Sequence, residues 1–106
     1  SLVNGNNAGI ILPTNTVVEL SGASTIAQIA GFAASQDGDT RLLRFTGAVT
    51  NWIVNEANSS FSTDGTAAHR IVTRTGGDIT QTNQPAWVKL RYRGTSSRWE
   101  VLDHSR

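Results

Sequence analysis

The chain has 106 residues, which is enough for one domain, and its formal net charge is +1 with 16% charged residues. It therefore lacks the dense basic stripe of a nucleic-acid binder, and with no cysteine it has neither disulfides nor cysteine chemistry. No apolar run approaches the roughly 20 residues of a membrane span. We expect one domain over residues 1–106, free-standing or a piece of a longer protein, without nucleic-acid binding or membrane insertion.

Uncharged polar residues dominate the composition. The chain holds 13 Thr, 10 Ser, 8 Asn and 10 Gly, but no Met and a single Lys. Thr favours strands, whereas Ser, Asn and Gly favour turns. The composition therefore predicts an all-β fold. For its architecture we expect a small antiparallel β-sandwich or an intertwined β-domain, on the strand pattern described below.

The N-terminal third offers three apolar segments. Residues 9–12 form a short apolar run before a proline, and a strand is expected over 16–20. Residues 25–32 fit a strand with Ile26 and Phe32 facing inward, although their apolar spacing also fits one helical turn. The flanking Thr and Gly favour the strand.

The middle of the chain alternates more clearly. An Asp-Gly pair within 35–39 is a strong hairpin signal, and residues 40–49 read as a half-buried strand. Leu43 and Phe45 share the inward parity of that strand. A further short strand is expected over 51–55.

The second half begins with a long polar loop and ends with the clearest strand pattern. We expect a strand over 69–75, a loop or edge segment over 78–85, and two strands over 86–94 and 98–102. Strands recur about every 8–12 residues, which suits a sandwich, a barrel or an intertwined β-fold. No convincing internal repeat is visible.

The last two strands predict a hairpin with one apolar and one cationic face. Alternation places Lys89, Arg91 and Arg93 with Trp87 on one side. We predict that the opposite, apolar face is a structural clamp packed against earlier strands of the same or a neighbouring chain. It consists of Leu90, Tyr92, Trp99 and Val101.

The order of these segments resembles the small β-structured modules of bacteriophage tail fibres and tailspikes. The stretches that carry the resemblance are GIILPTNTVVELSG, LLRFTGAVTNWIVN and the closing WVKLRYRGTSSRWEVLD, about two-thirds of the chain. The resemblance implies a homotrimer in the virion tail, made in the cytoplasm of the bacterial host. It also implies a role in trimer assembly, in attachment to the host surface, or in both.

No pattern indicates a catalytic centre, a metal site or a cofactor site. The sequence Asp37-Gly38-Asp39 is similar to part of a calcium loop but lacks the remaining oxygen ligands, so a turn is favoured. His69 and His104 are isolated and do not form a zinc pattern. We therefore expect no enzyme activity, no cofactor and no metal.

The tryptophans are the best candidates for ligand contacts, because sugars stack on exposed aromatic rings while polar neighbours bind their hydroxyls. Two groups fit this pattern. The first is Trp52 with Asn51 and Asn55, and the second is Trp87 with Arg91 and Arg93.

Both groups have an alternative reading, in which the rings fill the core or a subunit interface. If they bind a ligand, the expected partner is bacterial surface polysaccharide. The competing functional class is a monomeric carbohydrate-binding β-sandwich from a polysaccharide-acting enzyme.

Overall fold

A computed structural model describes residues 2–47, 50–57 and 61–106. The all-β prediction is confirmed, since these residues form strands and one short 3₁₀ helix, η1, at Ala67–His69. None of the described residues lies in a helix long and apolar enough to span a membrane. The strands are β1 (Gly5–Asn7), β2 (Val17–Leu20), β3 (Ile26–Ile29), β4 (Thr40–Phe45), β5 (Thr50–Ile53), β6 (Ile71–Val72), β7 (Ile79–Gln81), β8 (Ala86–Arg93) and β9 (Arg98–His104).

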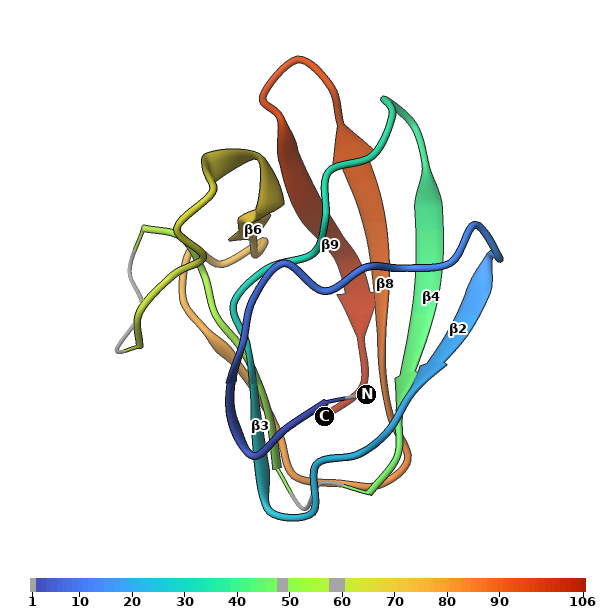
Figure 1. Cartoon of the computed structure of the whole chain (residues 1–106), viewed down its shortest axis with the longest axis vertical. Coiled ribbons are helices and arrows are strands. Elements are labelled where there is room, and N and C mark those ends of the chain that lie inside the picture. The colour runs from blue at the N-terminus through green and yellow to red at the C-terminus, as the bar shows by residue number, and fades with distance from the viewer. Residues whose placement is uncertain (1, 48–49, 58–60) are drawn as a thin grey trace.

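The strands form two sheets, with orders β1-β3-β5-β7 and β2-β4-β8-β9-β6. In Figure 1, β2, β4, β8 and β9 lie side by side, and β3 lies across from them. The chain passes from one sheet to the other after every strand from β1 to β7, and only the β8–β9 hairpin stays within one sheet.

Both sheets are mixed, so the expectation of purely antiparallel sheets is wrong. The pairs β1–β3, β3–β5, β2–β4 and β6–β9 are parallel, while β4–β8, β5–β7 and β8–β9 are antiparallel. Parallel neighbours need a crossover connection. Here the crossover runs through a strand of the opposite sheet, so the early strands stack as successive coils, like a solenoid.

This stacking is a structural repeat that the sequence does not show. The three stacked strands of the first sheet read GNN, IAQI and TNWI, with Gly5 beside Ala27 and Ala27 beside Asn51. The paired positions differ in size and polarity. The coils therefore repeat in backbone path without repeating in side-chain type.

The hydrophobic core lies between the two sheets. Alternation along β4 buries Leu43 and Phe45, as predicted, and Phe32 lies in the same core. The Trp99 ring meets Phe32 edge to face, with 6.1 Å between ring centroids. One chain thus supplies both sheets and the apolar cluster that they enclose.

The C-terminal hairpin contributes the largest side chains to this core. Leu90 lies opposite Val101, and Tyr92 lies opposite Trp99, on the inward face of β8 and β9. All four side chains are at most 3% exposed. The Tyr92 and Trp99 rings meet at 5.1 Å in a T-shaped contact, a geometry that stabilises aromatic pairs.

Ile26 is the main core prediction that fails. It is 46% exposed, because the register of β3 turns Ala27 and Ile29 inward instead. The strand over 25–32 itself is present, although it covers only Ile26–Ile29. The predicted strand over 69–75 is also shorter, since His69 closes η1 and only Ile71–Val72 pair with β9.

The Asp-Gly turn forms, but it does not join a hairpin. It leads into β4, whose neighbours in the sheet are β2 and β8. The Asp37 carboxylate accepts a hydrogen bond from the Gly94 amide at 2.8 Å. A Cβ at Gly94 would lie 2.7 Å from the Cβ of Asp37, so glycine permits this close approach. The turn is therefore docked on the tip of the β8–β9 hairpin.

Candidate functional site

The outer face of the five-stranded sheet gathers the side chains that the core does not use. Along β8 the outward positions are Trp87, Lys89, Arg91 and Arg93, as the alternation predicts. The neighbouring strand β4 places Arg44 opposite Trp87 and Leu42 opposite Lys89. This face therefore combines an indole, an aliphatic side chain and several cations.

Trp87 has a fixed backbone and a half-buried side chain. Its amide donates to Ser105 Oγ at 2.8 Å. Its carbonyl accepts from Gln81 Nε2 and from the Ser105 amide, each at 2.9 Å. Because these bonds hold the main chain from the inner side, the indole projects outward from a rigid base.

The three indole N–H groups differ in what they bind. Trp99 donates to the Ala33 carbonyl at 3.2 Å, and Trp52 donates to Asp78 at 2.8 Å. Trp87 Nε1 has no hydrogen-bond partner among residues 2–47, 50–57 and 61–106. Trp87 is therefore the tryptophan with a donor available to a ligand.

A hollow of about 450 Å³, the Trp87 hollow, is lined by Leu42, Arg44 and Trp87. Its size falls within the usual range of ligand sites. Arg44 lies 3.7 Å from Glu19, but both side chains are about half exposed or more, so this pair is weak. The hollow offers a ring for stacking and a guanidinium that can bind a carboxylate or phosphate.

The cations of β8 contribute unequally to this hollow. Lys89 lies across from Asp103, and within the described part of the chain Arg91 makes no ion pair. Arg93 is paired with Glu100 at 2.9 Å and is six residues from Trp87, roughly 20 Å along an extended strand. Arg93 therefore lies outside the hollow, although it shares the face.

The predicted group around Trp52 is not brought together as a ligand site. Trp52 lies on the outer face of its sheet, where its ring meets Phe61 edge to face at 4.8 Å. Asn51 points the opposite way and is fully buried beside Gln81. Adjacent strand positions face opposite sides of a sheet, so the two side chains cannot contact one ligand.

Asn55 holds two loops together and is only 2% exposed. Its Nδ2 donates to the Gly76 carbonyl at 2.7 Å, and its Oδ1 accepts from the amide and the hydroxyl of Thr73 at 3.0 and 3.2 Å. Its own amide donates to Asp78 at 2.7 Å. These bonds give Asn55 a structural role, and Asp78 joins it to the Trp52 indole.

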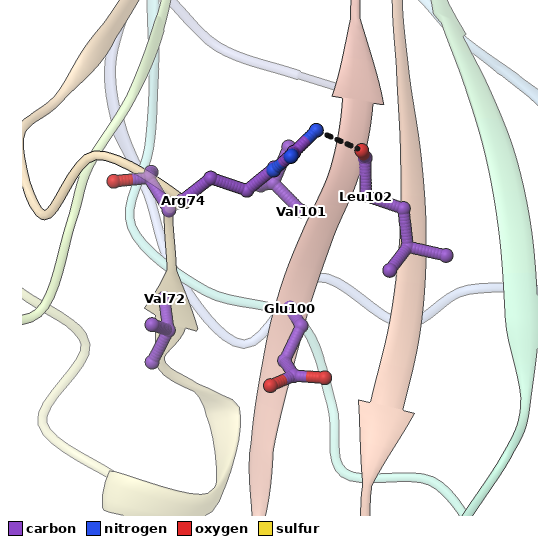
Figure 2. A pocket seen from close by; sticks show the side chains of 6 residues that line it. Val72, Arg74, Glu100, Val101 and Leu102 are labelled. Atoms are coloured by element: carbon purple, nitrogen blue, oxygen red, sulfur yellow. Dashed lines mark hydrogen bonds between the residues drawn. The ribbon is translucent and has the colours of Figure 1, made fainter.

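A second hollow on the outer face, about 240 Å³, lies where β6 ends beside β9. Figure 2 shows Arg74 reaching across it to the Leu102 carbonyl, a hydrogen bond of 3.3 Å. Val72 and Glu100 lie below this bridge in the same view. Arg74 covers the edge of β9, and Glu100 is already paired with Arg93. The residues of this hollow therefore shield the strand edge, since an uncovered edge can pair with another chain.

The acidic and imidazole groups serve the loops. Asp64 is buried and accepts hydrogen bonds from the amides of Gly9 at 2.6 Å and Thr66 at 2.9 Å. His69 Nδ1 lies 3.3 Å from the same carboxylate without a hydrogen bond to it. Within the described ranges, no three His, Cys, Asp or Glu side chains gather to hold a metal ion. The absence of enzyme activity stays a prediction.

Comparison with known proteins identified no relative. No protein-family model, no curated protein and no solved structure matches the chain.

Leu42 and Arg44 are the site residues that sequence reasoning missed. The alternation of the strand over 40–49 does place both on its outer face. What the sequence lacks is a signal that this strand pairs with β8, which begins some 40 positions later along the printed chain. The contact between Arg44 and Trp87 follows from that pairing.

Proposed function

We propose that this chain is an adhesion module of a bacteriophage tail fibre or tailspike. In this proposal it assembles as a homotrimer and attaches to polysaccharide on the bacterial surface through the Trp87 hollow. The phage setting rests on the resemblance of the three stretches quoted above. The attachment role rests on one observation, the half-buried indole with an available N–H beside Arg44 and Leu42.

The chemistry of the hollow suits a glycan with acidic groups. A sugar ring presents a C–H face that packs on the indole and on Leu42, and its hydroxyls can accept from the indole N–H. Arg44 supplies positive charge to this platform and pairs only weakly with Glu19, while Lys89 and Arg91 add positive charge further along β8, opposite Asp103 and Glu100. A uronate or a phosphate on the glycan would therefore be attracted.

The first coil, residues 2–20, offers the apolar surface that the proposed trimer needs. Val3, Ile11 and Val17 are 58%, 82% and 54% exposed, and β1 and β2 are the edge strands of their sheets. Ile11 also borders an adjacent hollow of about 350 Å³, whose other apolar lining is Leu2, Ala8, Ile10 and Leu20. Burying such side chains against a second copy is favourable.

The proposed trimer would pack whole units side by side. Each chain closes its own core, since Leu43 and Phe45 are buried within it. Ile11 and Val17 are exposed and stay available for contacts between chains. Exchange of strands between chains is therefore not required.

The same closed core supports a second candidate function, a monomeric carbohydrate-binding module of a polysaccharide-acting enzyme. Such a module would use the same Trp87 hollow. The two candidate functions predict different numbers of chains in the assembly, but the same binding site.

An array of acidic and neutral bacterial surface polysaccharides, probed with the full chain, tests the attachment role. We expect at least one acidic polysaccharide to bind, and Trp87→Ala to weaken that binding by about tenfold or more, as for interface tryptophans. Arg93→Ala is the matched control on the same strand and face, and it should retain binding within about twofold. Equal binding by Trp87→Ala and the parent chain, with both folded, would show that the hollow is not the attachment site.

A further inference from the structure

A polar hollow of about 640 Å³ lies at the other end of β4, away from the Trp87 hollow. It is lined by Leu12, Thr14, Ala34, Ser35, Gln36, Asp39 and Arg41. These residues come from the loop before β2, the loop after β3 and the start of β4. Hydroxyl, amide, carboxylate and guanidinium groups therefore meet in one concave surface, which we call the Asp39 hollow.

Arg41 is an unusual residue at its position. It occupies an inward-facing place on β4, opposite Leu90, and is only 9% exposed. Burying a guanidinium is costly unless its donors are satisfied. Nε donates to the Pro13 carbonyl at 3.0 Å, and Nη1 donates to the Thr40 carbonyl at 2.8 Å. The structure gives Nη2 no partner within the described ranges. A rigid guanidinium thus lines the hollow with donor capacity left over.

Asp39 supplies the complementary acceptor. Asp39 precedes Arg41 by two residues, and both residues line the hollow. One carboxylate oxygen accepts from the Ser35 hydroxyl and from the Gln36 amide. The Ser35 bond, then the Gln36 amide and the Arg41 charge, hold the pKa of Asp39 below its ordinary value. The carboxylate is therefore ionised in neutral solution.

We propose that the Asp39 hollow is a second binding site, which takes a neutral pyranose unit with adjacent free hydroxyls. One hydroxyl would donate to the Asp39 carboxylate while its neighbour accepts from Arg41. Leu12 and Ala34 provide the small apolar surface that a sugar C–H face contacts, and Thr14 and Gln36 provide further polar partners. A carboxylate beside a guanidinium disfavours both anionic and cationic ligands, whereas a diol uses both groups.

This inference deepens the proposed function, on which the choice of a sugar rests, but it concerns a different surface. The Trp87 hollow uses the outward positions Leu42 and Arg44 of β4, whereas the Asp39 hollow uses the inward position Arg41. The two sites can therefore be removed separately.

The test is a titration of the isotope-labelled full chain with methyl α-glycosides of glucose, galactose and mannose, followed by proton–nitrogen NMR. We expect at least one of them to cause saturable shifts in the amides of Ser35, Gln36 and Asp39 and in Nε–H of Arg41. Asp39→Asn, which keeps the side-chain shape, should weaken this binding by about tenfold or more, as should Gln36→Ala if Asp39→Asn fails to fold. Asp37→Asn is the control in the same turn, because Asp37 binds Gly94 and does not line the hollow.

Each outcome separates the two proposals. If no glycoside shifts these signals, or if Asp39→Asn binds like the parent chain, the Asp39 hollow is not a sugar site, whatever Trp87→Ala does on the array. If the signals shift and saturate in the parent and in Trp87→Ala alike, the second site stands by itself. Shifts confined to residues around Trp87 would overturn this inference and leave the proposed function intact.

Discussion

Single buried polar residues hold the loops of this protein in place, and Asn55 is the clearest case. Its side chain makes three hydrogen bonds to Thr73 and Gly76 while almost fully buried. Replacing it with alanine leaves buried backbone groups without partners, and such groups cost about 1–3 kcal/mol each. Asn55 therefore matters for stability, whereas the sequence had suggested ligand binding.

We expect Asn55→Ala to lower the free energy of unfolding by about 2–4 kcal/mol. For a domain of this size, that corresponds to a fall in melting temperature of roughly 10 °C or more. Asn15→Ala is the control, because Asn15 is exposed, and exposed changes usually stay within about 0.5 kcal/mol. Calorimetry in which both variants melt together would contradict the role given to Asn55.

Asp39 predicts a specific dependence of stability on pH. Its pKa in the folded chain lies below its ordinary value of 3.8, so the ionised form favours folding. The stabilisation is present above that ordinary pKa and is lost as the pH falls through the lower, folded value. As the pH falls below about 4, the melting temperature of the parent chain should therefore drop more than that of Asp39→Asn. Parallel melting curves across this range would show that Asp39 contributes nothing.

At the scale of elements, the β8–β9 hairpin is the part of the fold that the sequence predicts best. The alternation of Leu90, Tyr92, Trp99 and Val101 indicates one apolar face, and the structure buries all four side chains there. Trp99 contacts both Phe32 and Tyr92 through its ring and donates to Ala33. The hairpin therefore closes the core against the loop that follows β3.

Trp99→Ala should cost about 3–5 kcal/mol, because truncating a buried aromatic side chain leaves a cavity. Arg93→Ala on the opposite face should cost less than about 1 kcal/mol, since its ion pair with Glu100 is nearly half exposed at the arginine. Denaturant unfolding of both variants measures the difference. If the two midpoints coincide with that of the parent, the hairpin does not act as a clamp.

The order of the strands in the sheets could not be predicted, for a physical reason. Alternation reports which side chains share a face, but not which strands become neighbours. The Asp-Gly pair at Asp37 and Gly38 suggested that adjacent strands pair, whereas β4 pairs with β2 and β8. The Trp87 hollow depends on that long-range pairing. By contrast, the separation of Asn51 from Trp52 was available from alternation alone, because neighbours in a strand face opposite ways.

At the scale of the whole molecule, the fold presents the two surfaces to which we assign the proposed functions, and they adjoin where Val17 pairs with Leu42. The outer face of the five-stranded sheet carries the Trp87 hollow, while the first coil exposes Val3, Ile11 and Val17. Replacing Ile11 and Val17 together with serine should dissociate the proposed trimer. The monomer should keep its fold, because neither side chain lies in the core cluster. Sedimentation velocity measures the assembly state of this variant, and circular dichroism checks its fold. A trimer that persists in the folded variant would place the assembly surface elsewhere.

The molar mass of the unmodified chain in solution, measured by light scattering coupled to size-exclusion chromatography, tests the central claim most directly. A trimeric adhesion module has three times the chain mass of 11.3 kDa, and this mass should persist on dilution. A mass equal to one chain at every concentration would contradict the fibre proposal and favour the monomeric carbohydrate-binding module.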